Sequence, residues 1–201
     1  MNVASEKMKK TQRRIIKWSI STIIPSLLIF ILAQIISGWN LSRIVQKIEE
    51  SERIMVSFNA IYEDWPERST YETGSRLEAK YWAETNGWVV GIVAPEAEKH
   101  LARLRKNTSD LKAMQLWTWD DSIKLARTSY IRHAAVWEEL MNSQSECPFL
   151  ECLEVTFEDY GDEIESSFLS AETEFDRISP RFDMFRVVAR INKIFSDQVE
   201  N

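Results

Sequence analysis

The sequence predicts an all-α protein in which a single N-terminal transmembrane helix continues into an extracytoplasmic bundle of about five helices. Three observations support this fold class. An uncharged apolar stretch lies near the N-terminus, apolar residues recur after it at helical spacing, and the 201 residues hold only five Gly and five Pro, too few for a turn-rich β-fold. We expect a basic cytoplasmic tail over residues 1–17, a transmembrane helix over 18–39 and the bundle over 40–201.

The predicted membrane span, residues 18–39, contains no charged side chain and is long enough to cross a hydrocarbon core of roughly 30 Å. Trp18 and Trp39 bracket it, and indoles favour the two headgroup layers. Six Lys and Arg residues precede the span against one Glu, so the N-terminus is expected to stay in the cytoplasm. A cleaved signal peptide is the alternative, but its apolar region is shorter, about 7–15 residues, and an uncleaved signal-anchor is expected.

Small and hydroxyl residues recur on one face of the span: Ser19, Thr22, Ser26, Ala33 and Ser37. Such a stripe allows close approach of a neighbouring helix. It predicts a packing surface for a membrane-protein partner or for a second copy of the chain. The alternative is coincidence, because Ser and Ala are common in membrane spans.

Apolar residues continue beyond the span at intervals of three to four: Leu41, Ile44, Ile48, Met55, Phe58, Tyr62 and Trp65. Only Gly38 interrupts the pattern, which aligns with the small-residue stripe of the span. The spacing therefore predicts one continuous rod from Ser19 to Trp65, which Pro66 ends.

Further helices are expected beyond the rod. Ser69 and Glu72 form a capping-box pattern that opens a helix, and Asn86-Gly87 is expected to close it. The apolar run 88–94 is expected to be helix or loop. A helix from Pro95 follows, with an interruption expected near 107–110.

The sequence from Thr118 onward predicts three more helical stretches. Thr118 and Asp121 suggest a cap, and the helix after them carries an apolar side made of Trp119, Ile123, Ala126, Tyr130, Trp137 and Met141. An acidic helical stretch follows and is expected to break near Gly161. Ser179-Pro180 is expected to cap a final helix with an inward face of Phe182, Phe185, Val188, Ile191, Phe195 and Val199.

The only two cysteines, Cys147 and Cys152, lie five residues apart. Outside the cytoplasm such a pair favours a disulfide. Residues five apart in a regular helix are too distant to bond, but Pro148 places Cys147 in the turn before the helix. Two separate buried thiols are the alternative. No further Cys or His lies nearby to complete a metal site, and no metal or cofactor is expected.

Charge is concentrated in residues 133–176, which hold thirteen Asp or Glu and no Lys or Arg, between basic flanks. In the simpler interpretation, acidic and basic helices neighbour each other in the bundle and neutralise locally. In the other, an acidic face stays open and selects a basic protein surface. That face would consist of Glu151, Glu154, Glu158, Asp159, Asp162, Glu163 and Glu165. The spacing of these oxygens does not match a calcium-binding loop.

Recognisable catalytic patterns are absent from the sequence, including the serine-hydrolase elbow, the zinc-protease helix and a phosphate-binding glycine loop. His100 follows Glu96 by four residues, which predicts an ion pair on a helix surface. His133 precedes Trp137 by four residues and is expected to be a partly buried ring. The sequence therefore predicts a protein that is not an enzyme.

The expected function is that of a membrane-anchored accessory, assembly or regulatory subunit of a membrane complex, which acts by binding another protein. The formal net charge of −6 argues against nucleic acid as a partner. Two alternatives stay open: a ligand-sensing helical bundle that reports through a partner, and an envelope enzyme that uses carboxylates not marked by any motif.

Overall fold

The computed structural model describes residues 3–64, 85–118, 120–147 and 149–178, and these ranges contain helices and their connections with no strand. The long helices are α1 (Val3–Asn59), α3 (Ala94–Ala113), α4 (Asp121–Ser145) and α5 (Leu150–Ile178). A 3-10 segment, η1 (Ala60–Asp64), follows α1, and a π-helical segment, η3 (Val89–Val93), precedes α3. The all-α prediction is confirmed for the described part of the chain.

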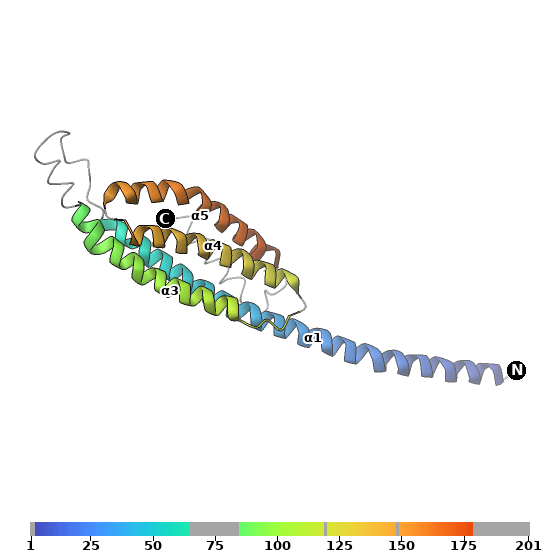
Figure 1. Cartoon of the computed structure of the whole chain (residues 1–201). Helices are drawn as coiled ribbons and strands as arrows, with labels where there is room; N and C mark the ends of the chain where they lie inside the picture. The colour runs from blue at the N-terminus through green and yellow to red at the C-terminus, as the bar shows by residue number, and fades with distance from the viewer. Residues whose placement is uncertain (1–2, 65–84, 119, 148, 179–201) are drawn as a thin grey trace, which may run out of the picture.

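Helix α1 is a single helix of 57 residues that contains both Pro25 and Gly38. It confirms the predicted rod through Asn59 and extends it toward the N-terminus, while residues 60–64 form η1 instead of α-helix. Its N-terminal half projects beyond the other helices, and its C-terminal half lies among them (Figure 1). The last predicted rod residue, Trp65, lies outside the described residues.

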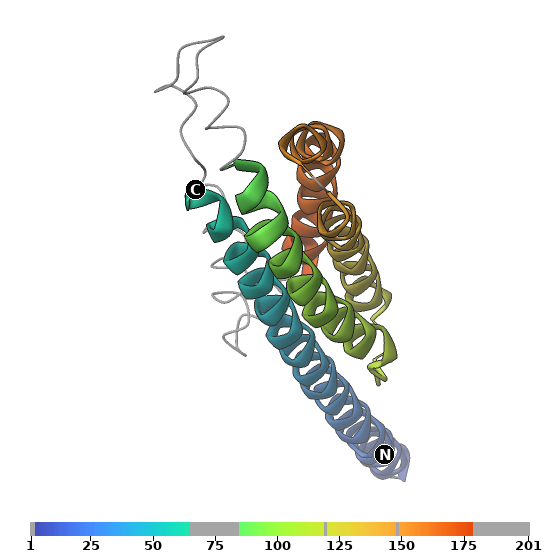
Figure 2. The same ribbon diagram turned by 60° about the vertical axis from the view of Figure 1, so that its left-hand side comes forward.

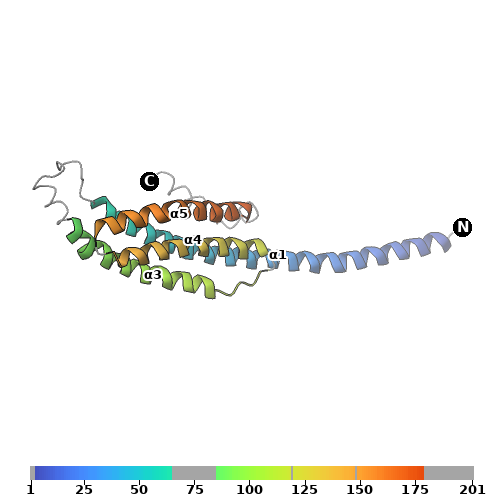
Figure 3. The same cartoon turned by 45° about the horizontal axis from the view of Figure 1, so that its top comes forward.

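The C-terminal half of α1 and helices α3, α4 and α5 run alternately up and down, so that consecutive helices are antiparallel (Figures 1 and 3). Contacts join α1 to α3, α3 to α4 and α4 to α5, and α1 also meets α4. Figure 2 shows α1 beside α3 and α4 beside α5. Short connections between antiparallel helices are typical of bundles of this kind.

One cluster of buried apolar side chains joins these helices. The predicted stripe of α1 from Leu41 to Phe58 and the predicted side of α4 from Ile123 to Met141 both face it, which confirms those two patterns. Its most buried large members are Leu41, Ile44, Ile48, Ile54, Met55, Phe58, Leu104, Leu111, Tyr130 and Phe175. The core fixes the C-terminal half of α1 and leaves the N-terminal half outside.

Three expected helix breaks are wrong. The chain is helical from 85 through 113, so Asn86-Gly87 does not close a helix, and α5 runs through Gly161. Neither glycine has a positive φ, which a left-handed helix end would require. No break occurs near Asn107 because its side chain bonds to α1 and does not compete with the helix backbone.

The number of helices, about five, stays a prediction. The segment expected to form a helix from Ser69 lies outside the described residues up to position 84, and so does the final helix expected from Ser179 onward. The apolar run 88–94, expected to be helix or loop, is helical and includes η3.

Candidate functional site

The apolar segment of α1, residues 23–36, is the longest run of exposed large apolar side chains on the described chain. Ile23, Phe30 and Leu32 each leave more than half of their surface uncovered, at 61%, 60% and 57%. Of the helices the structure describes, this one alone has the length and apolar composition needed to cross a membrane. The apolar segment is therefore the first candidate interaction surface.

The residues of the predicted small-residue stripe differ in how far they are buried. Ser26 is exposed, Ala33 is half-buried, and Ser37 is buried against the chain's own α3–α4 connection. Ser19 and Thr22 lie in the part of α1 for which only the backbone is described. Ser37 is thus occupied within the molecule, and the part of the stripe left for a neighbouring helix lies nearer the N-terminus.

The connection between α3 and α4, described over residues 114–118 and 120, is attached to α1 where the predicted span ends. We call it the junction loop. The side-chain amide of Asn40 donates to the Trp117 carbonyl at 3.0 Å, and the Ser37 and Thr118 hydroxyls are 2.9 Å apart. Arg127 donates to the Met114 carbonyl at 2.8 Å. These bonds hold the loop at a defined height on α1.

The cap of α4 is Asp120 and not Thr118, two residues earlier, which the sequence suggested as the cap together with Asp121. Asp120 Oδ1 accepts from the Ser122 N–H at 3.0 Å, which satisfies one of the unpaired donors at the helix start. Thr118 supports the cap, since its Oγ1 accepts from the Asp120 N–H at 3.0 Å. The predicted apolar residue Trp119 lies outside the described residues.

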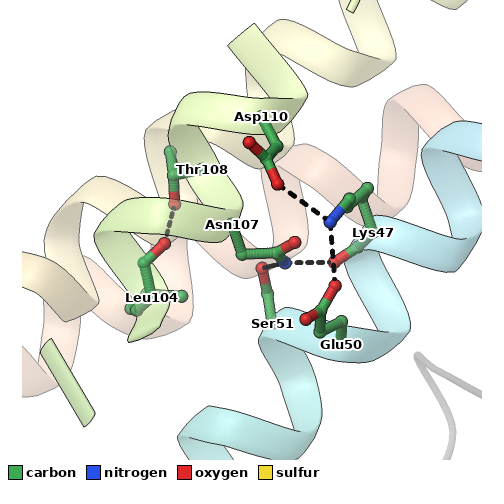
Figure 4. A network of polar contacts seen from close by, with 7 residues as sticks. All are labelled: Lys47, Glu50, Ser51, Leu104, Asn107, Thr108 and Asp110. Carbon is green, nitrogen blue, oxygen red and sulfur yellow. Dashed lines mark hydrogen bonds and ion pairs between the residues drawn. The ribbon is translucent and has the colours of Figure 1, made fainter. Parts of the chain in front are cut away.

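A polar network sets the register of α1 against α3 (Figure 4). The buried Asn107 amide of α3 donates to the Lys47 carbonyl at 2.7 Å and to Ser51 Oγ at 2.8 Å. At the rim, the Lys47 ammonium lies between Glu50 at 3.0 Å and Asp110 at 3.2 Å. The hydrogen bond to Glu50 raises the pKa of Lys47. The Asn107 amide reaches both acceptors on α1 in this register of the two helices, and a shift of α3 along α1 would leave the buried amide without them. The network therefore favours this alignment of α1 and α3.

Neither histidine lies on the surface. The expected ion pair of His100 with Glu96 is wrong, because Glu96 pairs with Lys99 at 2.7 Å while the His100 ring is buried and packs against Phe58. Burial lowers the pKa of His100. His133 was expected to be partly buried and is fully buried.

The His133 ring is held between α4 and α5. Its Nδ1 lies 3.0 Å from Ser167 Oγ, and it contacts the rings of Tyr130 and Phe168. Burial lowers the pKa of His133 to about 4. Tyr130 also donates a short hydrogen bond to the buried Glu52 carboxylate of α1. These polar contacts lie inside the core, away from any described opening, and their arrangement is that of structural residues.

The two cysteines form a disulfide at the end of the bundle opposite the projecting half of α1. Cys147 and Cys152 are bonded, with 5.6 Å between their α-carbons. Cys147 is buried with Val89, Val93 and Leu153 in a small apolar cluster. The disulfide therefore links the α4–α5 turn to the first turn of α5 and supports the contact with η3.

The predicted acidic residues lie on the first half of α5, at the end of the bundle far from the projecting half of α1 (Figure 1). Asp159, Asp162, Glu163 and Glu165 are all exposed. None of these four carboxylates forms an ion pair with another residue of the described chain. For Glu151, Glu154 and Glu158 only the backbone is described. We call the four exposed residues the acidic face.

An open pocket of about 410 Å³ lies between α3, α4 and α5. Its wall contains the following residues: Arg105, Ala135, Glu138, Glu139, Asn142, Ser143 and Tyr160. It is polar and open to solvent, unlike the enclosed, mainly apolar sites that hold small molecules. Among the described residues, no three His, Cys, Asp or Glu side chains are grouped so that they could bind a metal ion.

Comparison of the chain with protein-family models, curated proteins and solved structures gives no match. Function is therefore inferred from the chain's own exposed surfaces. Three of them stand out: the apolar segment of α1, the junction loop and the acidic face.

Proposed function

We propose that the chain is a single-pass membrane protein whose α1 apolar segment lies in the bilayer, with the N-terminus cytoplasmic and the bundle outside. The observation that carries this proposal is the exposure of the large apolar side chains within residues 23–36, each of which is at least 41% exposed. A contiguous apolar surface of this extent is unfavourable in water, where patches rarely exceed a few hundred Å². A hydrocarbon environment removes that cost.

The direction of insertion follows from charge. The basic residues that precede the span favour the cytoplasmic side, and the acidic bundle is the part expected to cross. Membrane attachment then confines the bundle to a thin layer above the surface. A partner in the same membrane meets it at a raised effective concentration.

An arginine placed at the middle of the apolar segment should weaken insertion. We expect Leu28→Arg to shift the full-length chain toward the soluble or degraded fraction, because a central Arg costs about 2.5–3.5 kcal/mol on insertion. The matched control is Val56→Arg, which adds the same charge to an exposed site on the bundle half of α1. The measurement is carbonate extraction combined with a C-terminal reporter that is active only outside the cytoplasm.

The wild-type chain should stay in the carbonate-washed membrane at full length, with an active reporter. A shortened soluble form would identify the N-terminal helix as a cleaved signal sequence, since such a sequence passes the same length and composition test. A cytoplasmic reporter signal would contradict the orientation.

We further propose that the bundle is a non-catalytic accessory, assembly or regulatory subunit that binds another protein through the acidic face. Four exposed carboxylates without an ion pair among the described residues support this over local neutralisation by neighbouring helices. An open field of one sign speeds association and selects a partner of opposite charge. Ser26, which is the exposed member of the small-residue stripe among the described side chains, offers a second contact within the membrane.

Removing charge from the acidic face should weaken association with a basic partner. We expect Asp162→Asn combined with Glu163→Gln to reduce the amount of partner that co-purifies in mild detergent, and to flatten the dependence of that yield on salt. Unfolding free energy should change by no more than about 0.5 kcal/mol, because both side chains are exposed.

The control for this pair is Glu98→Gln combined with Glu139→Gln, which removes the same charge from exposed positions on α3 and α4. Equal loss of partner in both double variants would show that net charge, and not the acidic face, controls binding. A strictly monomeric species with no co-purifying protein would contradict the subunit proposal.

A further inference from the structure

We propose that the junction loop is a second membrane contact, in which the Trp117 indole enters the headgroup layer of the leaflet that holds Trp39. The contact fixes the tilt of the bundle on the membrane surface. This inference rests on the proposed insertion of α1 and adds to it a lipid-binding role for a loop nearly eighty residues away in sequence.

The height of the loop on α1 supports the inference. Its two bonds to α1 are made at Ser37 and Asn40, on either side of Trp39, which is the last residue of the predicted span. Both α1 residues are buried by the loop. If Trp39 lies in the headgroup layer, the loop backbone bonded beside it lies at the same level.

The side chains of the loop point in two directions. Leu116 is partly buried and packs against the main core, whereas Trp117 leaves 72% of its surface exposed, the largest fraction among the exposed large apolar side chains. The Trp117 carbonyl is bonded to Asn40, so the residue is anchored through its backbone while the indole stays outside the bundle. An exposed indole is favourable in the headgroup layer because its apolar rings and polar N–H meet matching surroundings there.

The charged groups near the loop suit a lipid surface. Arg43 stacks over the Trp39 ring at 4.9 Å, and Lys112 is exposed in the last turn of α3. Asp121 is paired with Lys124 at 2.7 Å. Asp120, which caps α4, adds a negative charge that would repel lipid phosphates. Lipid phosphates therefore meet a mixed, slightly basic rim around the two indoles.

A second membrane contact matters because a long bundle is otherwise joined to the membrane by one helix, α1. The part of α1 from Trp39 to Asn59 spans about 30 Å at helical rise. A bundle held only by α1 would swing its far end, with the acidic face, through much of that distance. Two contacts at the membrane present the acidic face at a fixed height and direction.

Fluorine NMR can test the loop and the anchor in one sample. Full-length protein labelled with 5-fluorotryptophan is placed, one chain per disc, in phosphatidylcholine nanodiscs with or without a headgroup-spin-labelled lipid. Resonances are assigned from the single variants Trp39→Phe, Trp88→Phe and Trp117→Phe. We expect the spin label to abolish the signals of Trp39 and Trp117, and to leave that of Trp88, which directly precedes η3 and packs on the ring of Tyr62 in η1. The end of the bundle where α3 begins lies opposite the projecting half of α1 (Figure 1).

The outcomes separate the two proposals. Loss of the Trp39 signal with retention of Trp117 would overturn the loop contact and leave the anchor standing. Retention of both signals would overturn both proposals. A loop that meets a protein partner and not lipid would also keep the Trp117 signal here, because the disc contains no other protein.

Discussion

Replacing Phe58 by Ala should lower the free energy of unfolding by about 3–5 kcal/mol, a large share of the stability of a small domain. Phe58 is fully buried near the end of α1, where its ring packs on Tyr62 at 5.6 Å and on His100 at 5.9 Å between centroids. These neighbours come from η1 and α3, so they cannot collapse into the space without moving a helix. The substitution therefore leaves a cavity as well as losing apolar burial.

The control for Phe58 lies two residues away on the same helix. Val56 is 53% exposed, and Val56→Ala should change stability by no more than about 0.5 kcal/mol. Urea unfolding of the full-length protein in mild detergent, followed by near-ultraviolet circular dichroism, measures both variants. Equal midpoints for Phe58→Ala and Val56→Ala would mean that α1 does not contribute its predicted stripe to the core.

The features that the sequence could predict are those carried by local periodicity. Apolar residues at intervals of three to four on α1 and α4 mark the sides that the structure buries, because helix geometry places such residues on one face. The uncharged stretch and the continuous rod follow from composition in the same way. The fold class and the two most strongly patterned helices could therefore be predicted from neighbouring residues alone.

The features that the sequence could not predict depend on partners distant along the chain. Asn107 resembles a helix breaker until Ser51 and the Lys47 carbonyl, more than fifty residues earlier, bind its amide. His100 has an acidic neighbour at the right spacing, yet the aromatic packing with Phe58 buries its ring. Gly161 is tolerated within α5 because burial along the rest of the helix offsets a cost of about 1 kcal/mol.

The candidate surfaces were only partly predictable for the same reason. The acidic block is visible in the sequence, but whether it is neutralised depends on which helix lies beside it, and α5 packs mainly on α4. In the junction loop the sequence marked a helix cap at Thr118 and the apolar Trp119, but not the attachment to Ser37, which joins residues about eighty positions apart. A hydroxyl pair of this kind is recognised only once the helices are placed.

Acidification from pH 7 to pH 4 should destabilise the bundle by roughly 3 kcal/mol through His133 alone. The ordinary pKa of 6.5 falls to about 4 in the folded protein, mainly because burial disfavours the charged ring, although a hydrogen bond to the Ile164 backbone partly opposes the shift. Above pH 7 the His133 ring is mainly neutral in both the folded and the unfolded protein, so it does not change the stability. As the pH falls below 6.5 the unfolded state takes up the proton first, so stability is lost until the folded pKa is reached.

The variant His133→Gln isolates this contribution. Glutamine keeps a polar group near Ser167 of α5 but does not titrate, so its unfolding free energy should fall less steeply between pH 7 and pH 4 than that of the wild type. The lowered pKa values of His100, Glu96 and Asp121 act in the same direction in both proteins and cancel in the difference. Urea titrations at a series of pH values give that difference directly. Parallel curves for the two proteins would show that the His133 ring takes up protons equally well in the folded and unfolded states, which contradicts its burial between α4 and α5.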